Sequence, residues 1–109
     1  MVLVATHVDD DRIHTLGIIE ITVGRNAFGR QRESFEADLL IECLEGGPFH
    51  AIFIRAPVAT SAGPGVTVLS CMDQGIVAVE YGKQMALSFH PELSCDTRLH
   101  ERFLRKLGV

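Results

Sequence analysis

The chain has 109 residues, the size of one small domain. Hydrophobic residues make up 47% and charged residues 22%, as in ordinary globular proteins, so an intrinsically disordered chain is excluded. The net charge of −4 argues against a nucleic-acid partner, which needs a basic face. No apolar run approaches the roughly 18 residues of a membrane-spanning helix, so no membrane partner is expected.

The cysteine and histidine pattern indicates the compartment and argues against a metal site. The three cysteines are Cys43, Cys71 and Cys95, and no C-x-x-C motif occurs. An odd, widely spaced set predicts neither a disulfide framework nor a zinc cluster and favours a reducing cytoplasm. The start of the chain has no basic region or cleavage site of a signal peptide. The histidines lack metal-ligand spacing.

The first five residues, Met1 to Ala5, are uniformly apolar and are followed by an Asp triplet. This pattern predicts the tail of a buried element. Several segments rich in Ile, Val, Thr and alternating apolar residues then predict β-strands. The predicted strands are 16–23, 34–41, 51–54, 66–70, 76–81 and 85–89. Gly and Pro predict turns at 45–48 and 61–65, and short turns at 73–75 and 82–83 indicate a meander.

The segment 34–41 has the clearest strand pattern. Phe35, Ala37, Leu39 and Ile41 alternate with polar residues, except at Leu40, so one face is predicted to be buried.

The period changes near the end of the chain, where a helix is predicted from Thr97. Asp96 is the expected N-cap and Gly108 the expected C′ residue, with Lys106 in the last turn. Four apolar residues share one helical face, with the charged residues outside it. The apolar residues are Leu99, Phe103, Leu104 and Leu107, and the charged ones are Arg98, Glu101, Arg102 and Arg105.

The tripeptide His90-Pro91-Glu92 follows the last predicted strand and could carry chemistry. Residues i and i+2 of an extended chain point to the same side. A carboxylate at that position can hold an imidazole in the tautomer that a general base needs. The alternative is an ordinary strand end with a surface histidine. None of the three cysteines has a context that marks it as a nucleophile for this histidine.

Two arginine-containing segments are candidate anion sites. The segment from Arg25 to Arg32 is a basic loop that could hold a carboxylate or phosphate, or could simply be solvated. Arg55, which follows Ile54 at a predicted strand end, is either a site residue or a surface charge.

Together these segments resemble one family, the glutaminase subunit of pyridoxal 5′-phosphate synthase, a class I triad glutamine amidotransferase. The resemblance rests on LGIIEITVGRNAFGRQRESFEADL, FIRAP, IVAVEYG and SFHPELS, followed by a terminal helix that contains DTR. It extends from about Leu16 to Phe103. His-Pro-Glu is shared by many triad amidotransferases, whereas RNAFGRQ, SFEADL and FIRAP are specific to the vitamin B6 branch.

The resemblance implies a Cys-His-Glu triad that hydrolyses L-glutamine to glutamate and ammonia, with the ammonia delivered to the lyase subunit of the synthase. His90 would be the general base and Glu92 its orienting carboxylate. Arg25, Ile54 and Arg55 match positions that contact glutamine in the family. No cofactor and no metal are implied.

The resemblance also implies an α/β fold. Residues 1–109 would be the C-terminal portion of a flavodoxin-like amidotransferase domain, β-rich with a closing C-terminal helix. The Gly-Gly-Glu-Ser oxyanion loop and the Gly-Thr-Cys-Ala-Gly nucleophile elbow of the family do not occur in the sequence. Met1 to Ala5 resemble the helix that follows the elbow, so the nucleophile-bearing N-terminal half is expected to be absent and the chain alone inactive.

Two other hypotheses stay open at this point. One is a non-catalytic truncated remnant or interaction module that binds the synthase subunit. The other is the glutaminase of a different pathway, which rests on His-Pro-Glu alone and is disfavoured by RNAFGRQ and FIRAP.

Overall fold

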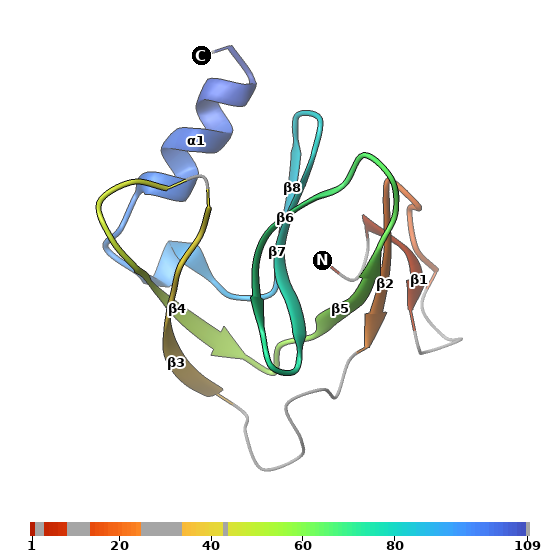
Figure 1. Cartoon of the computed structure of the whole chain (residues 1–109), viewed down its shortest axis with the longest axis horizontal. Coiled ribbons are helices and arrows are strands. Elements are labelled where there is room, and N and C mark those ends of the chain that lie inside the picture. Colours follow the sequence, from red (N-terminus) through yellow and green to blue (C-terminus); the bar gives the residue numbers. More distant parts are fainter. Residues whose placement is uncertain (2–3, 9–13, 25–33, 43, 109) are drawn as a thin grey trace.

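The computed structural model describes residues 1, 4–8, 14–24, 34–42 and 44–108, and within them the chain is strand-rich (Figure 1). The elements are β1 (Ala5–Val8), β2 (Ile19–Gly24), β3 (Ser34–Leu39), β4 (Phe49–Ile54), β5 (Val58–Ala62), β6 (Thr67–Met72), β7 (Gly75–Tyr81), β8 (Gln84–Leu87), the 3₁₀ helix η2 (Pro91–Leu93) and α1 (Arg98–Lys106).

The described strands form two sheets. The larger has the order β1-β2-β5-β7-β6, with β8 also paired to β7. β1 and β2 are parallel, and the other pairs are antiparallel, so this sheet is mixed. The smaller sheet is the antiparallel β3–β4 pair, which lies on the same side of the molecule as α1 in Figure 1.

The predicted meander is confirmed as β6, β7 and β8, which are joined by turns at Asp73–Gln74 and Gly82–Lys83. The alternation in 34–41 is also confirmed, since Leu39 and Ile41 are buried and Leu40 is 77% exposed. The strand itself ends at Leu39, two residues early.

Two strands were not predicted from the sequence, and the bounds of several predicted strands differ by a few residues; the strand predicted at 85–89, for example, is β8, which ends at Leu87. β5 was not predicted, and its last two residues, Ser61 and Ala62, lie in the segment 61–65 that was predicted to be a turn. Ala5 begins β1, whereas Val4 lies in a 3₁₀ turn and residues 2–3 lie outside the described part. Residues 16–18 precede β2 without belonging to it.

The hydrophobic core has two clusters. One fills the space between the β3–β4 pair, the meander and α1, and its largest fully buried side chains are Phe49, Phe53 and Leu99. The other covers β1 and β2, where Ile19, Ile21 and Val23 are buried. The first cluster matters for function because it supports the segment that follows β8.

Helix α1 is amphipathic, as predicted, but only Leu99 of its apolar face is buried. Phe103, Leu104 and Leu107 are 39%, 47% and 44% exposed. Gly108 follows the helix with φ +78°, as expected for a C′ residue.

The predicted N-cap was wrong by one position, because Thr97, not Asp96, occupies it. The Thr97 hydroxyl hydrogen-bonds to the Glu101 carboxylate at 3.4 Å. Asp96 Oδ1 still accepts a hydrogen bond from the Arg98 backbone N–H at 3.0 Å. It therefore satisfies one of the backbone donors that have no partner within the helix.

Candidate functional site

The His90 and Glu92 side chains meet directly after β8. His90 Nδ1 lies 3.2 Å from Glu92 Oε2. The two residues flank the start of η2, where Pro91 is the first helical residue and His90 has φ −107° and ψ 89°. The sequence predicted that an extended backbone brings the His90 and Glu92 side chains together. In the structure a 3₁₀ turn brings them together instead.

The electrostatics of this pair fix the role that each side chain can play. Glu92's own backbone N–H and the His90 imidazole lower the pKa of the Glu92 carboxyl, with a smaller contribution from His100. An ionised Glu92 only accepts hydrogen bonds, so it selects the tautomer with the proton on Nδ1. Nε2 of His90 then carries the lone pair and can take a proton. Both side chains are partly open to solvent, at 42% and 57%.

Contacts with β4 hold His90 in place. The His90 backbone N–H donates to the Ile52 carbonyl oxygen at 2.8 Å. The ring of Phe89 packs against Phe49 and Phe53, with centroid distances of 5.7 and 5.6 Å. One backbone hydrogen bond and two aromatic contacts therefore fix the histidine relative to β4.

The expected substrate residues Ile54 and Arg55 lie at the end of the same strand. Ile54 is 44% exposed. Arg55 has φ +47°, and no other non-glycine residue in the described ranges has a positive φ. A left-handed backbone costs a non-glycine residue free energy and is often found at functional sites. Arg25 lies outside the described residues, as does the rest of the segment 25–33.

A thiol partner for His90 is not found among the described cysteines. Cys71 on β6 and Cys95 between η2 and α1 are exposed and free, and neither is hydrogen-bonded to His90. Cys43 lies outside the described residues. Within the same part of the chain, no three His, Cys, Asp or Glu side chains are grouped to hold a metal ion.

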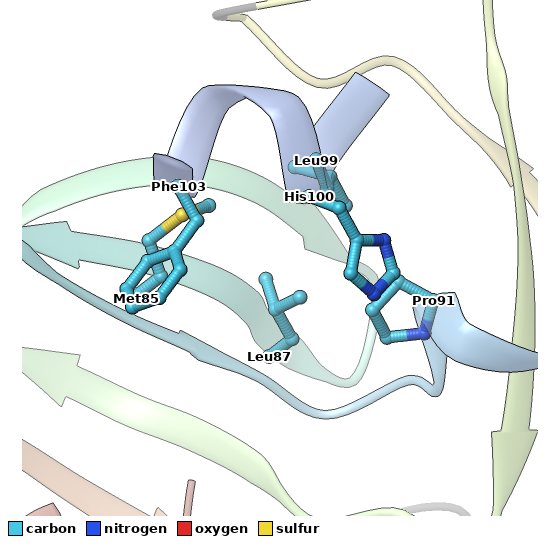
Figure 2. Close-up of a pocket in the computed structure, with 6 residues that line it drawn as sticks. All are labelled: Met85, Leu87, Pro91, Leu99, His100 and Phe103. Carbon is cyan, nitrogen blue, oxygen red and sulfur yellow. The ribbon is translucent and has the colours of Figure 1, made fainter. Parts of the chain in front are cut away.

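An apolar pocket lies beside the His90–Glu92 pair, between β8 and α1 (Figure 2). Its lining residues are Met85, Leu87, Pro91, Leu99, His100 and Phe103. Pro91, the residue between His90 and Glu92, forms one end of it. Residues of α1 and Pro91 of the segment that holds the pair therefore line the same pocket.

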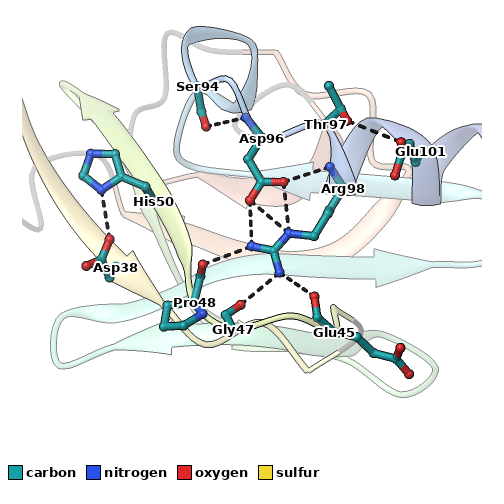
Figure 3. A network of polar contacts seen from close by, with 10 residues as sticks. All are labelled: Asp38, Glu45, Gly47, Pro48, His50, Ser94, Asp96, Thr97, Arg98 and Glu101. Carbon is teal, nitrogen blue, oxygen red and sulfur yellow. Dashed lines mark hydrogen bonds and ion pairs between the residues drawn. The ribbon is translucent and has the colours of Figure 1, made fainter.

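Sequence reasoning missed one residue near the site, Arg98, which was assigned only to the solvent-facing side of the helix. Its guanidinium instead binds Asp96 and the turn between β3 and β4 (Figure 3). The turn was predicted from Gly46-Gly47-Pro48, but its partner lies about fifty residues away, and no local pattern links the two.

The fold matches one class of protein. The chain belongs to the SNO glutamine amidotransferase family, whose model matches residues 1–108. A crystal structure of a glutamine amidotransferase is similar at a TM-score of 0.89 and 49% identity, covering 99% of this chain and 57% of that one. The expected strand-rich α/β fold with a closing helix agrees with this match.

Curated relatives carry a more specific name. "Pyridoxal 5′-phosphate synthase subunit PdxT" of Methanoregula boonei is 64% identical over all 109 residues, and that of Methanosphaerula palustris is 62% identical. The chain covers 56% and 55% of these two proteins, so it spans about half the length of the curated relatives that it matches.

No helix among the described residues is both long and apolar enough to cross a membrane.

Proposed function

We propose that residues 1–109 form the His-Glu portion of a Cys-His-Glu glutaminase that serves as a subunit of pyridoxal 5′-phosphate synthase. The observation that carries this proposal is the 3.2 Å contact between His90 Nδ1 and Glu92 Oε2, within a chain 64% identical to a synthase subunit. L-glutamine is the proposed substrate and the lyase subunit of the synthase the proposed partner.

In this mechanism Nε2 of His90 takes the proton from the nucleophilic thiol as it attacks the side-chain amide of glutamine. The same nitrogen then returns the proton to the departing ammonia. Glu92 holds the ring in position and stabilises the imidazolium that forms between these two steps. Water finally releases glutamate from the thioester.

The end of β4 at Ile54 and the segment 25–33 would bind the substrate. Arg25 and Arg55 are proposed to bind the α-carboxylate of glutamine, because a guanidinium offers paired donors to a carboxylate. Ile54 would contribute a backbone group. Ile54 is two residues from Ile52, whose carbonyl oxygen accepts the His90 backbone N–H, so the proposed base is anchored to the strand that carries Ile54.

The thiol is proposed to lie outside residues 1–109, because the Gly-Thr-Cys-Ala-Gly elbow does not occur in the sequence and neither Cys71 nor Cys95 is hydrogen-bonded to His90. The exposed, unpaired state of these two thiols supports action in a reducing compartment, which we take to be the cytoplasm.

The test is a chimera in which residues 1–109 replace the matching segment of the Methanoregula boonei relative. Glutamate release is measured with that organism's lyase subunit present. We expect turnover by the chimera, its loss on His90→Asn and its retention on His50→Asn, a substitution of a histidine near the start of β4. The isolated chain should show none.

Two results would overturn the proposal. One is glutamine hydrolysis by the isolated chain that disappears on substitution of one of its own cysteines. The other is a chimera that binds the lyase subunit but is inactive with His90 intact, which would favour a non-catalytic interaction module.

A further inference from the structure

We propose that Arg98 is a positioning residue that fixes the His90–Glu92 pair over β4. The proposal rests on the proposed function, because it assigns Arg98 a role in that reaction. Arg98 lies at the start of α1, in the same connecting segment as the pair, and touches neither of the two side chains.

All five N–H donors of the Arg98 guanidinium are used. Nε donates to both oxygens of Asp96, at 3.0 and 2.9 Å, and Nη2 donates to Asp96 Oδ2 at 2.6 Å. Nη1 donates to the carbonyl oxygens of Glu45 and Gly47 at 2.6 and 2.9 Å, and Nη2 to that of Pro48 at 3.0 Å. We call this set of contacts the Arg98 clamp (Figure 3).

The β3–β4 turn has the shape that the Arg98 clamp requires. Gly46 and Gly47 have φ values of +90° and +100°, which directs neighbouring carbonyl groups toward one point. A Cβ on Gly46 would lie 3.7 Å from Arg98 Nη1, so the guanidinium packs closely against this backbone. The guanidinium also lies 5.9 Å from the centre of the Phe49 ring.

Two contacts hold segment 89–98 in place. The Arg98 clamp acts at one end of the segment, and the hydrogen bond between His90 and Ile52 acts at the other. The turn leads directly into β4 at Phe49, and Phe89 packs on that same ring. His90 bonds to β4 further along, at Ile52. Segment 89–98, with η2 inside it, is therefore fixed at one end to β4 and at the other to the turn that leads into β4.

Chemistry explains why this position suits arginine. The acceptors are one carboxylate and three carbonyl oxygens spread around a plane, which match the planar fork of a guanidinium. A lysine ammonium has three donors on one atom and can satisfy only part of this set. Loss of the Arg98 clamp frees one end of the segment and lets η2 shift, while β4 keeps Ile54 and Arg55 in place.

The experiment compares Arg98→Lys with Arg105→Lys in the chimera described above. Arg105 lies in the same helix, is exposed and donates no side-chain hydrogen bond in the described part of the chain. For Arg98→Lys we expect kcat to fall about 10- to 100-fold, because displacements of about 1 Å have effects of this size. KM should stay nearly unchanged, and Arg105→Lys should behave as the parent.

A second readout does not depend on turnover. Long-range ¹⁵N–¹H spectra report which nitrogen of His90 carries the proton. We expect a single Nδ1–H tautomer in the parent chimera and a mixture in Arg98→Lys. If the parent is inactive, the proposed function fails, but the spectra still test the positioning role.

The proposal is overturned if Arg98→Lys lowers the melting temperature but leaves kcat and the tautomer unchanged. If Arg98→Lys does not fold, Asp96→Asn is the second variant, because it weakens the Arg98 clamp and keeps the three carbonyl contacts. It should lower kcat and mix the tautomers in the same way. Failure of both variants to fold would show that the Arg98 clamp is required for folding, and it would overturn the proposed positioning role.

Discussion

The backbone N–H of His90 donates a 2.8 Å hydrogen bond to the carbonyl oxygen of Ile52. This bond attaches the proposed general base to the strand that ends in Ile54 and Arg55, the proposed substrate residues. The separation between base and substrate is thus set by the backbone of β4. A movement of β4 would carry both groups together, whereas a movement of segment 89–98 would separate them.

Replacing Glu92 with glutamine should leave a partial defect in the chimera. The amide of glutamine can accept from or donate to Nδ1, so the required tautomer loses its advantage. We expect kcat to fall about 10- to 100-fold, as for other groups that orient a functional histidine. The measurement is kcat for glutamate release at neutral pH.

The matched control for Glu92 is Glu101→Gln in α1, which should retain parental kcat. A Glu92→Gln variant with parental kcat would show that the carboxylate does not orient His90.

Glu92 also affects the pH dependence of stability. Because its folded-state pKa is lowered, the Glu92 carboxyl stabilises the fold above its usual pKa of 4.5, and this contribution is lost as the pH falls through the lowered value.

The left-handed backbone of Arg55 predicts a difference between two substitutions. Arg55→Gly and Arg55→Ala both remove the guanidinium, so both should raise the KM for glutamine in the chimera. At φ +47° alanine carries backbone strain that glycine does not. Arg55→Gly should therefore be more stable than Arg55→Ala by about 1 kcal/mol in urea unfolding. Equal stabilities would mean that Arg55 has an ordinary backbone in solution.

The ion pair between Glu80 and Arg102 should be a strong link between β7 and α1. Glu80 has a side chain only 9% exposed and binds Nε and Nη2 of Arg102 at 2.5 and 2.9 Å, with Lys106 Nζ at 3.4 Å. Arg102→Gln removes the main partner of a nearly buried carboxylate. We expect the free energy of unfolding to fall by about 1–3 kcal/mol in urea titrations.

The control for Arg102 is Arg105→Gln, which should change the unfolding free energy by less than about 0.5 kcal/mol. The Arg102 guanidinium holds the pKa of Glu80 below 4.5. The contribution of the pair should therefore be present above pH 4.5 and disappear as the pH falls through the lowered pKa. A cost for Arg102→Gln that does not decrease as the pH falls below 4.5 would contradict the assignment, since protonation of Glu80 removes the charge that Arg102 binds.

His50 predicts a pH dependence of the opposite sign. It bridges two carboxylates of the neighbouring strand, with Nε2 2.7 Å from Glu36 and Nδ1 2.9 Å from Asp38. These hydrogen bonds raise the pKa of His50 above 6.5, and the bond to Glu36 contributes more than the bond to Asp38. The stabilisation by His50 should be complete below pH 6.5 and lost as the pH rises through the raised pKa.

The measurement for His50 is the melting temperature across this pH range. The advantage of the parent over His50→Gln should shrink as the pH rises, whereas His7→Gln, on an exposed position of β1, should follow the parent. Parallel pH curves for the parent and His50→Gln would contradict the proposed bridge.

The features that the sequence predicted well are those with local causes. The two-residue period of 34–41 reflects one buried face, and the apolar spacing around Leu99 reflects a helix on the core. The His90–Glu92 contact also follows from close spacing, although the backbone there is a 3₁₀ turn rather than an extended strand.

The features that were missed depend on partners distant in the chain. β5 is a strand because β2 and β7 flank it, whereas its own five residues, VATSA, mix strand formers with Ala and Ser and give no clear local signal. β1 is a strand because it pairs with β2 in parallel, which no local pattern specifies. Arg98 looked like a solvated helix residue because its carbonyl partners belong to a turn about fifty positions earlier.

The Arg98 clamp also has a kinetic consequence. It joins positions separated by 50 to 53 residues, so the chain must close a long loop before any of these hydrogen bonds can form. Contacts of this kind are made late, after the β3–β4 turn and α1 exist, and contribute little to the folding transition state. Weakening the clamp should therefore leave the folding rate almost unchanged and accelerate unfolding, so the guanidinium of Arg98 sets how long the native state persists rather than how fast it is reached.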